Sequence, residues 1–514
     1  MSRIMIYDTT LRDGAQAEGI SFSLEDKKDM IALLDDFGMD FIEGGMPSSN
    51  PKDLEMFSSP INLERSTLVA FGSTCRPGTD ADKDEGLKIL SECSADWVCI
   101  FGKAWDFQVT CALETTLEEN IRMIKDSVTF LRSKGKNVIF DAEHFFDGYK
   151  ENSDYALTSI TAAKEAGAEW IVLCDTNGGS LPGTVGKVTA DVCRTFDKVG
   201  IHCHNDSELA VACTLSAVEN GATMVQGTIN GIGERCGNAN LCSVIPDLKI
   251  KMGMDVPVDL NELTGVSRAA SELSNMSTTS NMPFVGDMAF AHKGGMHVSA
   301  LMKDTRTYEH IPPEVVGNKR KVLISDMSGR ASISKKVEEM GIKVNDTDLK
   351  RISEHVKEME SHGYQYEGAD ASFRLLVYRA IGKESKPFSI QGFRLHMEGV
   401  GMTGLNSEAS MKIADIAGEI EHTAADSEGP VGALDKAFKK ALMKFYPEIE
   451  NVRLTDYKVR VLDEKSGTDA WVRVLIRSTD GKKSWNTVGV SENVIEASLI
   501  ALSDSYEYAL ITKK

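Results

Sequence analysis

The sequence predicts an α/β protein, and two observations support this prediction. Eight short apolar runs alternate with amphipathic helical segments over roughly the first 250 residues, which is typical of parallel strands joined by crossover helices. The runs are almost continuously apolar, as expected for strands that are covered on both faces. Eight such repeats predict a TIM (β/α)8 barrel. A doubly wound open sheet is the alternative, but no Gly-x-Gly-x-x-Gly motif follows the first run.

The predicted strands can be read off in chain order. They are RIMIYD (3–8), MDFIEGG (39–45), TLVAFGS (67–73), DWVCIFG (96–102), NVIFDAEHF (137–145), EWIVLCDT (169–176), GIHCHND (200–206) and TMVQGTI (223–229). The first helix between them should begin at Ser23, because the spacing from Ser23 to Asp26 is that of a capping box. Its inward face is predicted to carry Met30, Ile31, Leu33, Leu34 and Phe37.

Changes of texture along the chain predict three domains. Residues 1–255 form the barrel, and residues 256–385 form a helical subdomain that contains the polar, glycine-rich stretch 290–320. Residues 386–514 are β-rich and contain two similar segments, each with strands, a loop and then a helix. We expect a pseudo-symmetric α+β domain there, with a regulatory or dimerising role rather than a chemical one.

Composition excludes several classes of partner. The chain has 57 basic and 77 acidic residues and a formal net charge of −20, which argues against nucleic acid and anionic membranes as partners. An anionic small molecule would need a locally positive pocket. No long apolar stretch resembles a secretory signal or a membrane helix. The ten cysteines follow no disulfide or zinc-knuckle spacing, so we expect a cytoplasmic protein with reduced thiols.

The strongest chemical signal is the pair His202 and His204 in the seventh predicted strand. Residues i and i+2 of a strand point to the same face, so both imidazoles should face one point while Cys203 packs on the opposite side. Active sites of TIM barrels lie at the carboxyl ends of the strands, and Asp13 follows the first strand there. Two histidines and one carboxylate suit Zn²⁺, Mn²⁺, Co²⁺ or Mg²⁺, with positions left open for substrate.

Other polar residues follow predicted strands at the same rim. Arg12 and Gln16 follow the first strand, Asp141 and Glu143 end the fifth, and Thr176 ends the sixth. Arg12 is a fixed positive charge that could stabilise an oxygen anion. Alternatively, it could only form a salt bridge with Asp13 or Glu143. We expect Gln16 and Asp141 to contact the substrate.

Three segments together resemble a known enzyme family. They are DTTLRDGAQAEGISFSLEDK (8–27), HCHNDSELAVACTLSAVENGA (202–222) and QGTINGIGERCGNANL (226–241). This combination is similar to the 2-isopropylmalate, homocitrate and citramalate synthases, which are metal-dependent TIM-barrel enzymes that condense acetyl-CoA with a 2-oxo acid. The resemblance covers nearly the whole chain, and GPVGALDKAF (429–438) is similar to the loop-to-helix segment of the family's regulatory domain.

The resemblance implies roles for individual residues. Metal ligands would be Asp13, His202, His204 and Asn238, while Arg12 would face the substrate carbonyl oxygen, Thr176 would bind the 2-oxo acid carboxylate, and Glu143 would be an active-site carboxylate. His297 and Tyr308 match a catalytic pair supplied by the subdomain, which in a homodimer can belong to the other protomer. His297 is the first candidate for the base that takes a proton from acetyl-CoA, and Glu143 is the alternative.

Two segments, 101–110 and 140–152, look most like the citramalate synthase branch, which uses pyruvate in isoleucine biosynthesis. The acidic end of the fifth strand disfavours 2-oxoglutarate, because a second buried carboxylate beside Asp141 would be costly. The branch also implies feedback inhibition by isoleucine through the C-terminal domain. Two alternatives remain open at this point: a 2-isopropylmalate synthase that uses 2-oxoisovalerate, and a catalytically silent sensor of branched-chain amino acids.

Overall fold

A computed structural model describes residues 3–322, 330–366, 368–383, 386–400, 403–462 and 470–512. The chain folds into two compact units. The first unit comprises Met1–Phe290 and Ile311–Lys319, and the second comprises Ala291–His310 and Arg320–Lys514. The predicted fold class, with its barrel, helical subdomain and C-terminal α+β part, is confirmed.

The first unit is built on a closed parallel barrel of eight strands in sequential order. The strands are β1 (Met5–Asp8), β2 (Phe41–Gly45), β3 (Thr67–Ser73), β4 (Trp97–Lys103), β5 (Asn137–Glu143), β6 (Trp170–Asp175), β7 (Val199–Cys203) and β8 (Met224–Gly227). Strand β1 pairs in parallel with both β2 and β8, with Ile6 opposite Val225. This closure excludes the alternative of an open sheet.

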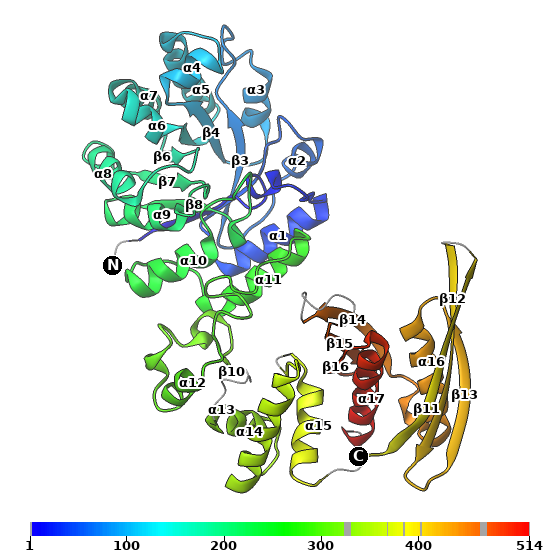
Figure 1. The fold of residues 1–514 in the computed structure, drawn as a ribbon. Coiled ribbons are helices and arrows are strands. Elements are labelled where there is room, and N and C mark those ends of the chain that lie inside the picture. The colour runs from blue at the N-terminus through cyan, green and yellow to red at the C-terminus, as the bar shows by residue number, and fades with distance from the viewer. Residues whose placement is uncertain are drawn as a thin grey trace. The chain divides into compact units, whose positions relative to one another are not determined.

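Helices follow the strands around the barrel (Figure 1). They are α1 (Leu24–Phe37), α2 (Pro51–Met56), α3 (Glu85–Glu92), α4 (Asp106–Cys111), α5 (Leu117–Ser133), α6 (Phe145–Glu151), α7 (Ser153–Glu165), α8 (Pro182–Cys193), α9 (Ala210–Glu219), α10 (Leu241–Pro246) and α11 (Leu263–Leu273). Helix α1 begins with the expected capping box, in which Ser23 and Asp26 exchange hydrogen bonds. Leu33 is only partly buried, whereas the other four predicted inward residues of this helix are buried.

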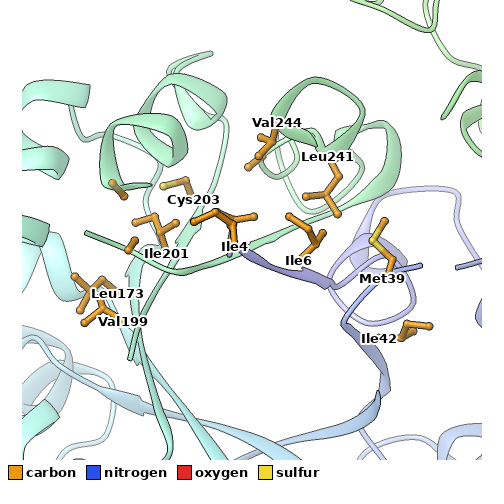
Figure 2. Close-up of a cluster of buried hydrophobic side chains, with 14 of the residues drawn as sticks. Ile4, Ile6, Met39, Ile42, Leu173, Val199, Ile201, Cys203, Leu241 and Val244 are labelled. Carbon is orange, nitrogen blue, oxygen red and sulfur yellow. The ribbon is translucent and has the colours of Figure 1, made fainter. Parts of the chain in front are cut away.

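Alternation of side chains along each strand divides the apolar residues of the first unit into two layers. One layer lies between the strands and the surrounding helices and includes Ile201 and Cys203 of β7, together with Leu241 of α10 (Figure 2). The other layer fills the barrel interior and includes Tyr7 and Phe71. Cys203 is therefore a packing residue, and its neighbours in β7 face the opposite side, as expected.

The second unit begins with a small helical part. Its elements are β9 (Ala291–His292), α12 (Gly295–Leu301), β10 (Lys321–Val322), α13 (Arg330–Glu339), α14 (Asp346–Ser361) and α15 (Asp370–Ala380). Ile352 and Val356 of α14 are buried, and the partly buried Leu349 and Met359 pack against the same cluster. Their spacing of three or four residues places these four side chains on one face of α14.

The C-terminal part of the second unit contains the same arrangement twice. Three antiparallel strands, β11 (Phe388–Val400), β12 (Thr403–Asp415) and β13 (Ile420–Ser427), precede α16 (Pro430–Phe445). A second set, β14 (Arg453–Val461), β15 (Val472–Thr479) and β16 (Ser484–Ser491), precedes α17 (Val494–Thr512). Each helix contacts its own sheet, so the two similar segments inferred from the sequence are present (Figure 1).

Among the described residues, no helix has the length and apolar character that crossing a membrane requires.

Candidate metal centre and active site

Three candidate metal ligands converge at the carboxyl end of the barrel. The Nε2 atoms of His202 and His204 lie 3.4 Å apart, and the Oδ2 atom of Asp13 lies 3.4 Å from the first and 4.0 Å from the second. All three residues are buried, and their ligand atoms form a group that could hold a metal ion. Two aromatic nitrogens and a carboxylate oxygen at this spacing fit a divalent cation.

Asp13 and His204 have protonation states that suit metal binding, whereas for His202 burial lowers the pKa but the carboxylate of Asp13 outweighs burial and raises it. Burial by itself raises the pKa of Asp13, but Arg12 and His202 outweigh it and hold that pKa well below its usual range. Burial, together with the neighbouring His202 ring, lowers the pKa of His204 to about 4. An ionised carboxylate and a neutral imidazole are the forms that coordinate a metal.

A fourth candidate ligand atom, the side-chain oxygen of Asn238, supports this fit. Asn238 is 1% exposed and forms a β-bridge with His204. Its Nδ2 donates a hydrogen bond to the carbonyl oxygen of Ile232 at 3.2 Å, whereas its Oδ1 is buried and has no hydrogen-bond partner among the described residues. A buried amide oxygen without a partner is costly, and a cation would satisfy it.

Arg12 is fixed beside the metal ligands by three contacts. Its Nε donates to Glu43, which is fully buried in the middle of β2, and its Nη1 lies 3.2 Å from Asp13. Its guanidinium carbon lies 3.8 Å from the centre of the Phe71 ring, a cation–π distance. The salt bridge considered in the sequence analysis is present with Asp13, and the second carboxylate that contacts Arg12 is Glu43 rather than Glu143.

These groups surround a cavity of about 300 Å³. It is lined by Arg12, Asp13, Gln16, Met46, Phe71, Phe101, Asp141, Glu143, Cys174, Thr176, His202, His204, Glu234 and Arg235. Every residue that we predict for the barrel rim lines this cavity, apart from Asn238, which pairs with His204. This cavity volume is at the low end of the range for ligand sites, so the cavity suits a small substrate.

Two of the cavity residues have partners that set their orientation. Glu143 accepts a hydrogen bond of 2.5 Å from Lys103, at the end of the neighbouring strand β4. The Oγ1 atom of Thr176 accepts a hydrogen bond of 2.8 Å from the backbone N–H of His144. Its hydroxyl hydrogen has no acceptor among the described residues, so it can be donated into the cavity.

His297 and Tyr308 belong to the second unit. Their rings stack with centroids 4.1 Å apart and an interplanar angle of 24°. Both side chains are exposed in this unit, and Tyr308 is 45% exposed. The chain therefore brings the two residues of the predicted pair together.

Sequence reasoning missed Glu43, Lys103 and Gln226, which contact predicted site residues. Glu43 and Lys103 are each the polar residue near the carboxyl end of an apolar strand, and the rule used for β1, β5 and β6 could have found both. Gln226 lies within β8, where a polar side chain in a fully buried strand was the available signal.

Three protein families match consecutive parts of the chain. The HMGL-like family matches residues 3–269, the "Homocitrate synthase post-HMGL domain-like" family matches residues 284–364, and the "LeuA allosteric (dimerisation) domain" family matches residues 367–510. Together these three matches follow one another along the chain and cover nearly all of it.

Full-length relatives narrow this assignment. The (R)-citramalate synthases of Aquifex aeolicus and Geobacter sulfurreducens are each 51% identical to this chain, and each comparison covers 99% of this chain and 98% of the relative. The 2-isopropylmalate synthase of Methanocaldococcus jannaschii is 31% identical, covering 100% of this chain and 96% of the relative. The chain belongs to the HMGL-like family and, within it, to the group of the (R)-citramalate synthases.

Proposed function

We propose that this chain condenses acetyl-CoA with pyruvate and then hydrolyses the thioester, which yields citramalate and CoA. The observation that carries the proposal is the convergence of Asp13, His202 and His204 at the carboxyl end of the barrel. Full-length similarity to (R)-citramalate synthases supports the choice of reaction. The intact ligand set argues against a silent sensor, which would not need it.

The cofactor in this proposal is a divalent metal ion held by Asp13, His202, His204 and Asn238. When bound, such an ion supplies a Lewis acid that polarises the ketone of the 2-oxo acid. Nitrogen and oxygen ligands are compatible with Zn²⁺, Mn²⁺, Co²⁺ and Mg²⁺, and the experiment below compares these ions.

Arg12, Gln16 and Thr176 would bind the 2-oxo acid. Arg12 is partly buried and permanently charged, and Glu43 and Phe71 hold it in one orientation at the cavity wall. It would stabilise the alkoxide oxygen that forms when C2 is attacked. Thr176 would donate its free hydroxyl hydrogen to the substrate carboxylate, and Gln16 lies on the same wall with an amide that can do likewise.

The acidic residues of the cavity support a substrate with a single carboxylate. Asp141, Glu143 and Glu234 line the cavity, and Lys103 is already engaged by Glu143. Burial raises the pKa of Asp141 to about 6, and the charges around it do not reverse this effect, so Asp141 is largely ionised at neutral pH. A second substrate carboxylate would face these groups at a large electrostatic cost, which disfavours 2-oxoglutarate.

A base must remove a proton from the methyl group of acetyl-CoA. We propose His297, assisted by Tyr308, because the two rings stack and are accessible in their unit. The enolate carbon then forms a bond with C2 of pyruvate. Water subsequently cleaves the carbon–sulfur bond of the thioester, and CoA leaves as the thiol. Glu143, whose carboxylate accepts a hydrogen bond from Lys103, is the alternative base.

We also propose that the C-terminal part of the chain forms a homodimer and binds isoleucine as a feedback inhibitor. Two observations support this: the repeated sheet-and-helix arrangement of residues 388–512 and the match to the LeuA allosteric domain. A pseudo-symmetric domain of this kind can present equivalent surfaces to a second copy.

The first experiment measures release of CoA thiol from acetyl-CoA with pyruvate, 2-oxobutyrate, 2-oxoisovalerate or 2-oxoglutarate. Each reaction is run with Zn²⁺, Mn²⁺, Co²⁺ or Mg²⁺ after removal of bound metal by a chelator. We expect turnover to require metal and to be fastest with pyruvate. Preference for 2-oxoisovalerate would instead make the chain a 2-isopropylmalate synthase, for which the similarity to the M. jannaschii enzyme is the supporting observation. Absence of thiol release with all four acids would refute the synthase proposal.

A second experiment separates the two candidate bases. Exchange of the acetyl-CoA methyl protons with deuterated water reports proton removal independently of the later steps. With a non-reacting pyruvate analogue present, His297→Gln should abolish the exchange, while Glu143→Gln should retain it. The reverse result would assign the proton transfer to Glu143.

A further inference from the structure

Gln226 connects one metal ligand to the far wall of the cavity. It lies on β8, is fully buried, and makes two side-chain hydrogen bonds. Its Oε1 lies 2.9 Å from Nδ1 of His202, and its Nε2 donates to Oδ1 of Asp141 at 3.1 Å. The three side chains come from β7, β8 and β5, so the contact runs across the barrel interior.

The direction of these hydrogen bonds follows from the chemistry of the groups. An ionised carboxylate can only accept hydrogen bonds, so Asp141 requires the NH2 group of Gln226. The amide oxygen is then left facing His202, and this oxygen can only accept. The Nδ1 atom of His202 must therefore carry a hydrogen, so in the neutral imidazole the lone pair lies on Nε2, which faces Asp13 and His204.

We infer that Gln226, itself oriented by Asp141, is a positioning residue that fixes the tautomer of His202 and thereby presents Nε2 to the metal. The inference rests on the proposed metal centre. Outer groups that hold a histidine ligand in this way commonly raise metal affinity by roughly 10- to 100-fold. Asp141 thus has a structural task in addition to lining the cavity.

The second histidine provides an internal contrast. Nδ1 of His204 is buried and has no hydrogen-bond partner among the described residues. The protein therefore orients the two ligands unequally: hydrogen bonds fix His202, whereas the metal itself must hold His204. Of the two imidazoles, only that of His202 has a hydrogen-bond partner at Nδ1 among the described residues. Loss of Gln226 should remove this partner.

The test measures Mn²⁺ affinity by calorimetry on the full-length, metal-free protein. Gln226→Met keeps the size of the side chain and removes both hydrogen bonds, and we expect it to weaken Mn²⁺ binding roughly 10- to 100-fold. Gln391→Met, at an exposed glutamine of β11, is the matched control and should bind Mn²⁺ like the native chain. Equal affinity of Gln226→Met and the native chain would overturn the inference.

A double variant distinguishes tautomer control from simple packing. In Asp141→Asn/Gln226→Glu, the asparagine amide can donate to the new carboxylate, whose other oxygen accepts the hydrogen on Nδ1 of His202. We expect this variant to retain native Mn²⁺ affinity although it changes both side chains. If packing alone mattered, Gln226→Met, which keeps the volume of the side chain, would also bind Mn²⁺ like the native chain.

The outcomes also separate this inference from the proposed function. If the native protein binds neither Mn²⁺ nor any of the other three ions of the first experiment, the metal-dependent function itself fails. If the native protein binds Mn²⁺ and a folded double variant does not, only the role of Gln226 fails. Where Gln226→Met does not fold, the test still has a decisive outcome, because a folded double variant that fails to bind Mn²⁺ overturns the inference.

Discussion

The proposed role of Arg12 depends on the shape of its side chain as well as on its charge. Its planar guanidinium contacts the face of Phe71 while one edge is paired with Glu43 and Asp13. A lysine could supply the charge, but it has neither a flat face for the ring nor a fork of donors for two carboxylates. The position of the charge in the cavity would no longer be fixed.

We therefore predict that Arg12→Lys lowers kcat by about 10²- to 10³-fold, as loss of a preorganised donor to a developing oxyanion does. The KM for acetyl-CoA should change far less, since Arg12 is proposed to contact the 2-oxo acid. Steady-state measurement of thiol release checks both values. Arg194→Lys, at an exposed arginine of the same unit, should leave both unchanged. A native kcat in Arg12→Lys would contradict the proposed role.

Asp8 is a buried carboxyl at the end of β1 that should make stability depend on pH. It is 0% exposed, and burial raises its pKa to about 7, although two hydrogen bonds from Thr10 oppose the rise. In the unfolded chain this carboxyl loses its proton near pH 4. Between about pH 4 and 7 the folded state therefore binds more protons, so the contribution of Asp8 to the free energy of unfolding decreases as pH rises.

Asp8→Asn removes this titration while keeping the shape of the side chain. We predict that the melting temperature of Asp8→Asn, relative to that of the native protein, increases between pH 5 and pH 8. The underlying free energy is at most about 4 kcal/mol. Differential scanning calorimetry at several pH values measures this difference, with the exposed Asp29→Asn as the control. A difference that does not vary with pH would show that Asp8 is already ionised in the folded chain.

The residues of the site were predictable to different degrees, for physical reasons. His202, His204 and Asp13 were found because strand alternation and the barrel rim determine where such side chains point. Glu43 and Gln226 are also near strand ends, but a lone buried Glu or Gln has no spacing motif. Their roles become visible only through contacts between strands that are distant in sequence.

At the scale of elements, the loop after β8 determines where Asn238 lies. Gly237 has a φ of +85°, and a Cβ atom there would lie 1.9 Å from the carbonyl oxygen of Gly231. That same oxygen accepts the backbone N–H of Asn238 at 3.1 Å. A side chain at position 237 would therefore displace the backbone bond that holds Asn238 in place.

We predict that Gly237→Ala lowers both the melting temperature and the Mn²⁺ affinity. Gly253→Ala is a matched control, because Gly253 also has a positive φ, of +65°, but a Cβ atom there would meet no atom within 4 Å. The control should show only the conformational strain of a left-handed alanine, about 1–2 kcal/mol, with native Mn²⁺ affinity. Equal losses of affinity in the two variants would mean that backbone strain, rather than the contact with Gly231, is responsible.

The secondary structure of the barrel was predictable because its strands are nearly continuous apolar runs between polar helices. Six of the eight strands lie within the predicted segments, and β4 and β7 each extend one residue beyond theirs, at Lys103 and Val199. The fine structure of the glycine-rich stretch 290–320 was not predictable, because short helical turns such as η5 (Thr305–Thr307) carry no periodic signal. The contact between His297 and Tyr308 depends on those turns.

At the scale of the whole molecule, the repeated C-terminal arrangement is the proposed binding site of an effector that inhibits catalysis. We predict that millimolar isoleucine inhibits thiol release and raises the melting temperature. A ligand that binds only the folded chain adds about 2.7 kcal/mol when its concentration is 100 times its dissociation constant. Activity assays and thermal melts with isoleucine, and with leucine for comparison, measure both effects.

Sedimentation velocity on the same samples checks the proposed homodimer. If neither amino acid changes activity or melting temperature, the C-terminal part has a role in assembly only. If the chain also sediments as a monomer, both proposals for this part are wrong.

Because β8 must pair with β1 to close the barrel, the metal ligands come together late in folding. Asp13 precedes the first helix, whereas His202, His204 and Asn238 come near the end of the barrel sequence. During synthesis, a growing chain cannot assemble this ligand set until more than two hundred residues have emerged and the two distant ends have met. Because such long-range contacts form slowly, metal acquisition should be a late event, and an ion could be captured only by a chain that has already completed its barrel.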